Sequence, residues 1–246
     1  PSDLIDLGGI AELKGIKEEG GGITIGAMTR HADVAHSEVV KRVIPALAAL
    51  AELIGDPAVR NRGTIGGSIA FADPAAELPA CFLALDGEAE IMGKGGGRWV
   101  KADDFFKGLY ETAIGPDEML TAVRIPAARP NMRYGFAELS RRHGDYALAG
   151  LAACAQAEGR ALNDVRLAYF GVGLTPVRAK RAEAALAAGS VDAAVKALAA
   201  DQLAGGDRLA VRVGLPASAV TPDWLRFIGL SLRRDTLTAA AVVRKP

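Results

Sequence analysis

Cysteine and histidine are scarce in this sequence, which has 2 cysteines and 3 histidines among 246 residues. Cys81 and Cys154 lie far apart in apolar surroundings, so we expect two buried free thiols rather than a disulfide framework. His31, His36 and His143 show no metal-ligand spacing with either cysteine. We therefore expect neither a zinc site nor an iron–sulfur motif on this chain.

An excess of charge of one sign is also absent, since 29 basic and 29 acidic residues give a formal net charge of zero. Nucleic-acid-binding proteins usually show a basic surplus, so we expect no nucleic-acid partner. No apolar run reaches the roughly 18 residues that a membrane span requires. No signal peptide is visible either, and the sequence predicts a soluble, cytoplasmic protein.

The residues that are present are typical of a globular protein, with 50% hydrophobic and 24% charged residues. The length is sufficient for one large domain or two packed domains. The proline-rich run IPAARPN is the best candidate for a boundary. We expect an α+β protein with one domain over residues 1–128 and another over residues 129–246.

Local patterns predict the elements of both domains. Pro45 is expected to kink or divide the helix over residues 37–54. The first domain should contain a strand over 1–10, a hairpin around the GGG turn at 20–22, the helix over 37–54, a hairpin over 88–101 and a strand over 117–126. The second should contain a three-stranded antiparallel sheet from residues 134–140, 146–158 and 162–173, with helices over 175–189, 190–203 and 221–240.

The segment GTIGGS, residues 63–68, combines three glycines with two hydroxyl residues. Glycines allow close approach of a ligand, and successive N–H groups of such a turn can form an anion-binding nest. Thr64 and Ser68 add hydroxyl donors. A glycine-rich turn without a ligand explains the segment equally well. It matches neither a P-loop nor a Rossmann fingerprint, so a nucleotide site here would be of another kind.

Two carboxylates, Asp73 and Glu77, follow this segment, and Asp73 precedes a proline as a turn starter does. A carboxylate would repel a pyrophosphate but could accept hydrogen bonds from ribose hydroxyls. The combination therefore points to a dinucleotide. Each carboxylate alone is explained as well by a helix cap or a solvated position.

Three segments in order, VRNRGTIGGSIAFADPAAELPA, DFFKGLYETAIGPDEMLTAVRIP and LSRRHGDYALAG, resemble the FAD-binding medium subunit of the molybdenum hydroxylases. This family includes aerobic carbon monoxide dehydrogenase and xanthine dehydrogenase, and the resemblance extends over nearly the whole chain. It implies an FAD-binding domain of the PCMH/vanillyl-alcohol-oxidase type, followed by a C-terminal domain with a three-stranded antiparallel sheet and helices.

The resemblance also implies a set of cofactor-binding residues, and no catalytic or metal-binding residue on this chain. It implies that Thr64 to Ser68 hold the FAD pyrophosphate. A Cβ at Gly66 or Gly67 would block close approach of the phosphates, so we predict that replacing either glycine by a bulkier residue abolishes FAD binding. Ile54 and Leu120 are explained equally well as core positions, and Tyr146 as a half-buried strand residue. Together with Asp73, which its place after GTIGGS indicates, the predicted FAD-binding residues are Ile54, Thr64, Ile65, Gly66, Gly67, Ser68, Asp73, Glu77, Leu120, Asp145 and Tyr146.

Family members carry a first glycine-rich FAD loop, on a βαβ unit, before the segment that corresponds to LIDLGGI. That loop is not found in this sequence, which begins at Pro1. We therefore expect either a fragment of a longer product or a subunit whose FAD site is weakened or lost.

In the family, hydroxylation takes place at a molybdenum–pterin cofactor of a large subunit, and an iron–sulfur small subunit with two [2Fe-2S] clusters passes the electrons on. The resemblance implies that FAD on this chain receives them and delivers them to an external acceptor, within a dimer of heterotrimers. One alternative is a scaffold subunit of the same complex that has lost FAD binding. Another is a stand-alone oxidase, for which no covalent-flavin histidine or cysteine is evident.

Overall fold

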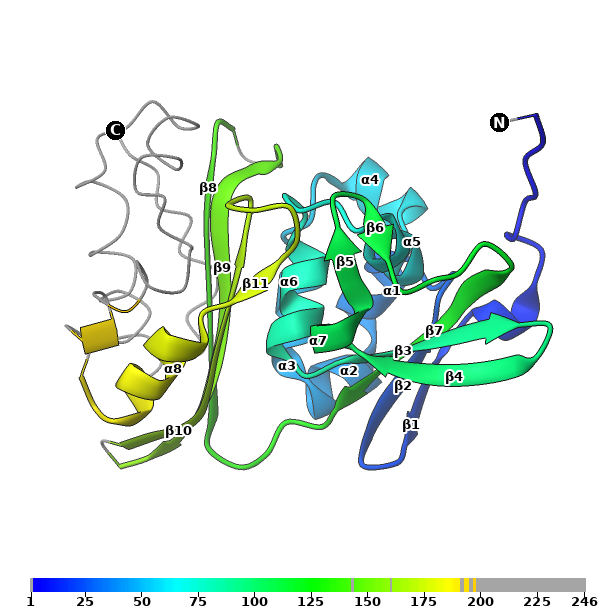
Figure 1. Cartoon of the computed structure of the whole chain (residues 1–246). Coiled ribbons are helices and arrows are strands. Elements are labelled where there is room, and N and C mark those ends of the chain that lie inside the picture. The colour runs from blue at the N-terminus through cyan, green and yellow to red at the C-terminus, as the bar shows by residue number, and fades with distance from the viewer. Residues whose placement is uncertain (1, 143, 160, 191–192, 195–196, 198–246) are drawn as a thin grey trace.

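The computed structural model of the chain describes residues 2–142, 144–159, 161–190, 193–194 and 197. It contains a five-stranded sheet of order β1-β2-β7-β3-β4 and a four-stranded sheet of order β11-β10-β9-β8. Helix α6 lies between the two sheets, as Figure 1 shows. The described part of the chain is therefore a mixed helix-and-sheet structure in layers.

The five-stranded sheet is antiparallel throughout and contains both predicted hairpins. Gly20 and Gly21, with φ of 61° and 78°, close the first hairpin in a conformation that favours glycine. Ile23 and Ile25 alternate along the strand and are fully buried. The strands are β1 (Ile16–Glu19), β2 (Gly22–Gly26), β3 (Glu88–Gly93), β4 (Gly96–Lys101) and β7 (Glu118–Pro126).

The strand predicted for residues 1–10 was wrong for the part that is described. Residues 2–10 form no strand, and a short 3₁₀-helix, η1 (Ala11–Leu13), precedes β1. Leu4 and Ile5 are 89% and 85% exposed, and the segment runs away from the body of the molecule in Figure 1. Alternating apolar residues form a strand only where a neighbouring strand can pair with them.

Several short helices gather at the five-stranded sheet. The predicted helix over 37–54 is divided as expected, because Ile44 ends one helix and Pro45 opens the next. None of the helices in the described residues is both long and apolar enough to cross a membrane. The helices are α1 (His31–His36), α2 (Glu38–Val43), α3 (Pro45–Ala51), α4 (Pro57–Arg62), α5 (Ile65–Phe71), α6 (Glu77–Ala84) and α7 (Ala102–Phe105). A two-stranded sheet, β5 (Phe106–Gly108) and β6 (Glu111–Thr112), follows α7.

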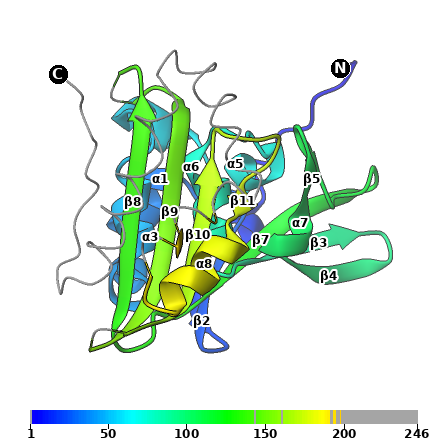
Figure 2. The same ribbon diagram turned by 60° about the vertical axis from the view of Figure 1, so that its left-hand side comes forward.

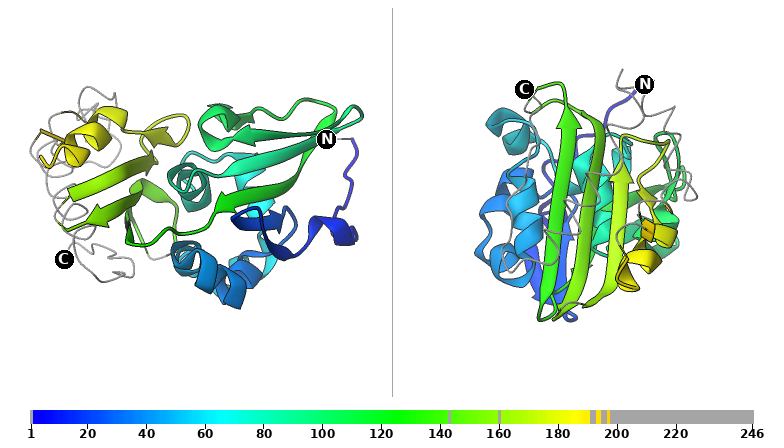
Figure 3. Two further views of the ribbon diagram at one scale, coloured as in Figure 1. Left: turned by 90° about the horizontal axis from the view of Figure 1, so that it is seen from below. Right: turned by 90° about the vertical axis from the view of Figure 1, so that its left-hand side faces the viewer.

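The four-stranded sheet contains the predicted antiparallel meander and one further strand. Its strands are β8 (Met132–Ser140), β9 (Ala147–Glu158), β10 (Ala161–Phe170) and the short β11 (Val177–Arg178). Helix α8 (Lys180–Ala187) covers the face turned away from α6, as Figures 2 and 3 show. The expectation of three strands is corrected to four. The helix expected over 221–240, and most of that over 190–203, lies outside the described residues.

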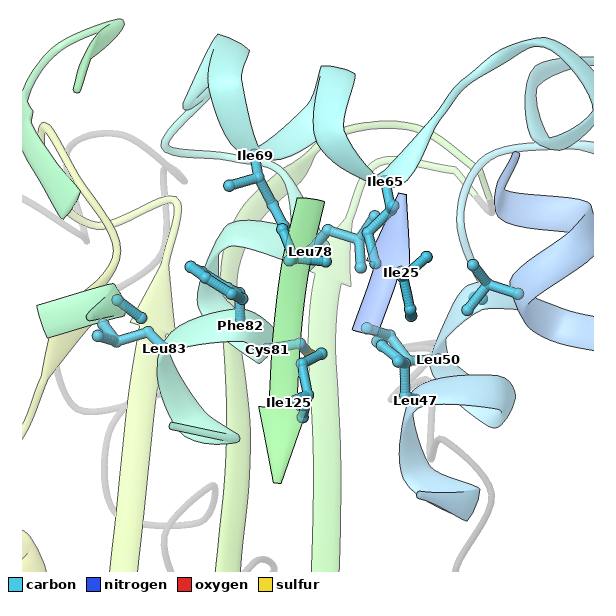
Figure 4. Close-up of a cluster of buried hydrophobic side chains, with 14 of the residues drawn as sticks. Ile25, Leu47, Leu50, Ile65, Ile69, Leu78, Cys81, Phe82, Leu83 and Ile125 are labelled. Atoms are coloured by element: carbon cyan, nitrogen blue, oxygen red, sulfur yellow. The ribbon is translucent and has the colours of Figure 1, made fainter. Parts of the chain in front are cut away.

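The main hydrophobic core continues from one sheet to the other through α6. Every residue from Leu78 to Ala84 is buried, and Phe82 shares one cluster with Ala152 and Phe170 of the second sheet. Figure 4 shows Leu78, Phe82 and other side chains of this cluster. Cys81 and Cys154 are both buried free thiols, as expected, and the Cys154 thiol lies 3.1 Å from the carbonyl oxygen of Ala84.

A buried carboxylate, Glu183, fixes α8 to the second sheet. Its side chain is 9% exposed, and one oxygen accepts a hydrogen bond from the backbone N–H of Leu167 at 2.8 Å. The guanidinium of Arg178, itself 13% exposed, donates to both carboxylate oxygens at 2.5 and 2.8 Å. Removal of the carboxylate would leave a buried cation and a buried N–H group without this partner.

We predict that Glu183→Ala lowers the free energy of unfolding by about 3 kcal/mol, because breaking a buried ion pair costs roughly that much. Urea unfolding followed by circular dichroism measures the change. The matched control is Glu38→Ala, which removes an exposed pair with Lys41 and should cost less than about 0.5 kcal/mol. Equal effects of the two substitutions would contradict a structural role of Glu183.

Candidate functional site

The segment GTIGGS opens a helix instead of forming the expected turn. Thr64 is the N-cap of α5, and its hydroxyl oxygen accepts a hydrogen bond from the backbone N–H of Gly67 at 3.1 Å. Neither Gly66 nor Gly67 has a positive φ. The two glycines are therefore not required here by an unusual backbone conformation.

The backbone N–H groups at this helix start are already bonded within the chain. Ile65 donates to the carbonyl of Thr29 at 3.0 Å, and Gly66 donates to the carbonyl of Ala27 at 2.9 Å. Arg30 and Thr64 also form an isolated β-bridge. The expected nest of ligand-facing N–H groups is thus corrected: these groups attach the start of α5 to residues 27–30, which follow β2.

Gly66 is required by its contact with Ala27. A Cβ atom at Gly66 would lie 2.4 Å from the Cβ and 2.6 Å from the Cα of Ala27, which is closer than atoms can approach. A Cβ at Gly67 would meet only the hydroxyl oxygen of Thr64, at 2.8 Å. Gly66 is buried, whereas Gly67 is exposed and lines a cleft. Gly66 therefore allows close packing against Ala27, whereas Gly67 borders the cleft.

This cleft, which we call the main cleft, has a volume of about 520 Å³ and lies beside the start of α5. It brings together residues that are far apart in the sequence. The eight predicted residues that line it are Ile54, Thr64, Gly67, Ser68, Asp73, Glu77, Asp145 and Tyr146. Ile65, Gly66 and Leu120 do not line it. Ile65 and Leu120, 0% and 7% exposed, belong instead to the hydrophobic core.

The loop between β8 and β9 forms one edge of the main cleft. Gly144 has a φ of 81° and packs against the backbone of Gly55, where a Cβ at Gly144 would lie 3.3 Å from the carbonyl oxygen. The Asp145 carboxylate accepts the backbone N–H of Tyr146 at 3.1 Å. The Tyr146 ring is 64% exposed, so it lies at the opening of the cleft.

Two carboxylates, those of Asp73 and Glu77, also line the main cleft. Asp73 accepts a hydrogen bond from the backbone N–H of Ala75 at 2.8 Å, which confirms its expected role in a turn. Glu77 is the first residue of α6. Burial raises the pKa of the Glu77 carboxyl, and the charge of Asp73 raises it further. The Glu77 side chain therefore carries its negative charge less readily than an exposed glutamate.

Another carboxyl group, that of Glu138 on β8, lies close enough to Glu77 to be affected by its charge. Burial, and secondly repulsion from Glu77, raises the pKa of Glu138 to about 7. Near neutral pH the two protonation states of Glu138 are therefore both populated. Because the pKa values of Glu77 and Glu138 are both raised, these two carboxyl groups together carry less than two negative charges near neutral pH.

The sequence patterns missed several residues of the main cleft. Arg62 lines the cleft and directly precedes Gly63 and Thr64 in the sequence. Its place next to the segment GTIGGS could therefore have marked it as a cleft residue. Phe71 ends α5 and packs its ring 5.0 Å from that of Tyr110. His31 also lines the cleft, but no local motif marks it.

A second cavity, the polar groove, has a volume of about 690 Å³ and shares Met28, Arg62 and Thr64 with the main cleft. Lys14 and Arg30 also line it. The two cavities adjoin at these three shared residues, and their linings include apolar side chains, hydroxyl groups, carboxylates and cations. Such a site fits an extended molecule that has both aromatic and polar parts. No cluster of potential metal ligands is found among the described residues.

Comparison with known families gives two matches along the chain. Residues 1–128 match the family described as the FAD binding domain in molybdopterin dehydrogenase. Residues 134–214 match the C-terminal domain of the CO dehydrogenase flavoprotein.

Similar proteins include the carbon monoxide dehydrogenase medium chain of Hydrogenophaga pseudoflava, which is 40% identical over 178 residues, 72% of this chain and 62% of that protein. The nicotine 6-hydroxylase medium subunit of Paenarthrobacter nicotinovorans is 42% identical over 171 residues, 70% of this chain and 60% of that protein. This chain thus spans less than two thirds of the length of both relatives.

Solved structures resemble the chain as well. One is a carbon monoxide dehydrogenase from Hydrogenophaga pseudoflava that lacks the Mo-pyranopterin moiety, with a TM-score of 0.77 and 38% identity, covering 88% of this chain and 80% of that one. Another is quinoline 2-oxidoreductase from Pseudomonas putida 86, with a TM-score of 0.81 and 31% identity, covering 95% of this chain and 84% of that one.

We predict that Gly66→Ala lowers the free energy of unfolding by about 2 kcal/mol or more, because the added methyl group overlaps Ala27. Thermal unfolding without any ligand measures this change. Gly95→Ala is the control, since nothing lies within 4 Å of a Cβ at Gly95, and it should change stability by less than about 0.5 kcal/mol. A Gly66→Ala variant as stable as the wild type would refute the packing role.

We also predict a pH-dependent effect of Glu138→Gln. The folded-state pKa of Glu138, about 7, lies above its ordinary value of 4.5, so the folded state binds the proton more tightly. Ionisation therefore removes stability as the pH rises from about 4.5 to 7. Glutamine cannot ionise, so the variant should be more stable than the wild type at pH 8, by about 1–2 kcal/mol after allowance for solvent screening.

The stability difference between Glu138→Gln and the wild type should shrink toward pH 4, where the glutamate is protonated in both the folded and the unfolded state. Urea unfolding at several pH values measures it. Glu12→Gln, at an exposed position, serves as the control and should show no such trend. A constant difference across this pH range would contradict the raised pKa.

Proposed function

We propose, because this chain belongs to the family of FAD-binding domains in molybdopterin dehydrogenases, that it acts as the FAD-binding medium subunit of a molybdenum-containing dehydrogenase or hydroxylase. The observation that carries the proposal is the main cleft. Eight residues that were predicted from the sequence for FAD binding line this one cavity, although they come from five separate segments of the chain.

The donor set of the main cleft fits a flavin dinucleotide. Hydroxyl groups of Thr64 and Ser68 and the guanidinium of Arg62 suit an anionic pyrophosphate, while carboxylates suit sugar hydroxyls. The raised pKa of Glu77 reduces repulsion between that carboxyl and a phosphate group. An apolar wall with an exposed tyrosine at the opening suits an aromatic ring system.

Each group of residues has a distinct part in the proposed binding. The hydroxyl groups of Thr64 and Ser68 would hold the pyrophosphate, Gly67 would leave room for it, and Arg62 would contribute positive charge. Asp73 and Glu77 would accept hydrogen bonds from hydroxyl groups of the ligand. Ile54 would exclude water from the inner wall, and the loop with Asp145 and Tyr146 would orient the flavin at the opening.

When bound, FAD would supply two-electron uptake from an iron–sulfur partner and release of the electrons to an external acceptor. The chain itself would bind and orient the cofactor without a catalytic acid or base. In this proposal the partners are a small subunit with two [2Fe-2S] clusters and a large subunit with the molybdenum–pterin cofactor. The assembly would be a dimer of heterotrimers in the cytoplasm.

Titration of the flavin-free protein with FAD tests the proposal. We expect quenching of flavin fluorescence with a dissociation constant in the micromolar range or below, which corresponds to about 8 kcal/mol of binding free energy. The absence of fluorescence quenching even at high FAD concentration would refute FAD binding and favour the scaffold alternative.

Tyr146→Ala should weaken FAD binding about fivefold to tenfold, because loss of an aromatic contact costs about 1 to 1.4 kcal/mol. It should also shift the visible absorption spectrum of bound flavin. The matched control is Trp99→Ala, since Trp99 is also partly exposed but lies on β4, outside the residues that line the main cleft. Equal affinities of both variants and the wild type would contradict the proposed place of the flavin.

A further inference from the structure

His31 stands out as a polar group of the main cleft that no motif assigned to binding. It is the first residue of α1, its side chain is only 5% exposed, and it lines the cleft. Within the described part of the chain, its ring nitrogens make no hydrogen bond, and neither is sealed off as a fully enclosed polar atom. The remaining accessible surface of the ring therefore faces the cleft.

The position of the ring is tightly fixed. The backbone N–H of His31 donates to the carbonyl of Gly63 at 3.0 Å. A Cβ at Gly63 would lie 2.8 Å from both Nε2 and Cδ2 of the imidazole, so the ring packs directly against this glycine. His31 is thereby held beside the residue that precedes the N-cap Thr64.

The surroundings also fix the charge of the ring. Burial lowers the pKa of His31 to about 4, so at neutral pH the imidazole is uncharged. A neutral imidazole offers one N–H donor and one acceptor nitrogen. A ligand that covered this group without bonding to it would leave it unpartnered, at a cost in free energy that a hydrogen bond to the ligand avoids. An apolar ring would fill the space next to Gly63 without that cost.

We infer that His31 is a ligand-binding residue of the main cleft, whose imidazole N–H donates a hydrogen bond to an oxygen atom of the bound dinucleotide. This inference rests on the proposed function. It adds one hydrogen-bond donor, on α1, to the hydroxyl donors at the start of α5. The start of α1 and the start of α5 are held side by side by the hydrogen bonds between residues 27–31 and residues 63–66. One ligand could therefore contact the donors of both helices.

The test compares FAD affinities of the full chain by fluorescence titration. His31→Phe keeps a ring against Gly63 but removes the N–H group, and it should raise the dissociation constant about tenfold or more, as expected for a hydrogen bond to a phosphate oxygen. His31→Gln keeps an N–H donor and should remain within about threefold of the wild type. His36→Phe is the matched control, because His36 is exposed at the other end of α1 and bonds Ala32.

Two results would overturn the inference while leaving the proposed function intact. One is wild-type FAD affinity in His31→Phe. The other is equal weakening by His31→Phe and His31→Gln, which would mean that ring shape matters and the N–H group does not. Failure of the wild-type chain to bind FAD would instead overturn the proposed function together with this inference. Should His31→Phe fail to fold by circular dichroism, His31→Leu is judged by the same criteria.

Discussion

The structure depends on one helix that has no solvent-exposed face. All residues of α6 after Glu77 are buried, because the helix is packed on one side by the helices and five-stranded sheet and on the other by β9 and β10. A helix that is apolar all round is stable only when it is enclosed. The sequence ELPACFLA therefore commits the chain to a layer on each side of α6. The hydrophobic effect of that burial holds the two sheets together.

The main cleft is a consequence of this arrangement. Glu77 lies at the N-terminal end of α6, where the buried helix reaches the surface. The second sheet, held against α6, brings the loop with Asp145 and Tyr146 to the same place. The first sheet contributes the start of α5, which hydrogen bonds attach to residues 27–30. Distant parts of the sequence thus meet because one helix packs against both sheets.

The sequence was sufficient for elements that depend on local chemistry. Glycine turns and alternating residues predicted both hairpins and the meander, and Pro45 predicted the division of the helix at Ile44. The error at residues 63–68 arose because adjacent glycines also indicate a turn. The structure instead requires a glycine at residue 66 because the backbone there lies close to Ala27, and no local sequence pattern encodes such a tertiary contact. For the same reason the sequence missed His31, whereas the predictions made from the sequence included eight of the other cleft residues.

The shared core has a consequence for how a ligand would be received. Because one hydrophobic cluster contains residues of both sheets, the two sheets cannot separate without exposing Phe82 and Phe170 to water. Opening and closing by a hinge would therefore be costly, and the cleft is preorganised. A dinucleotide would enter a space whose width is already set, so little conformational entropy would be lost on binding.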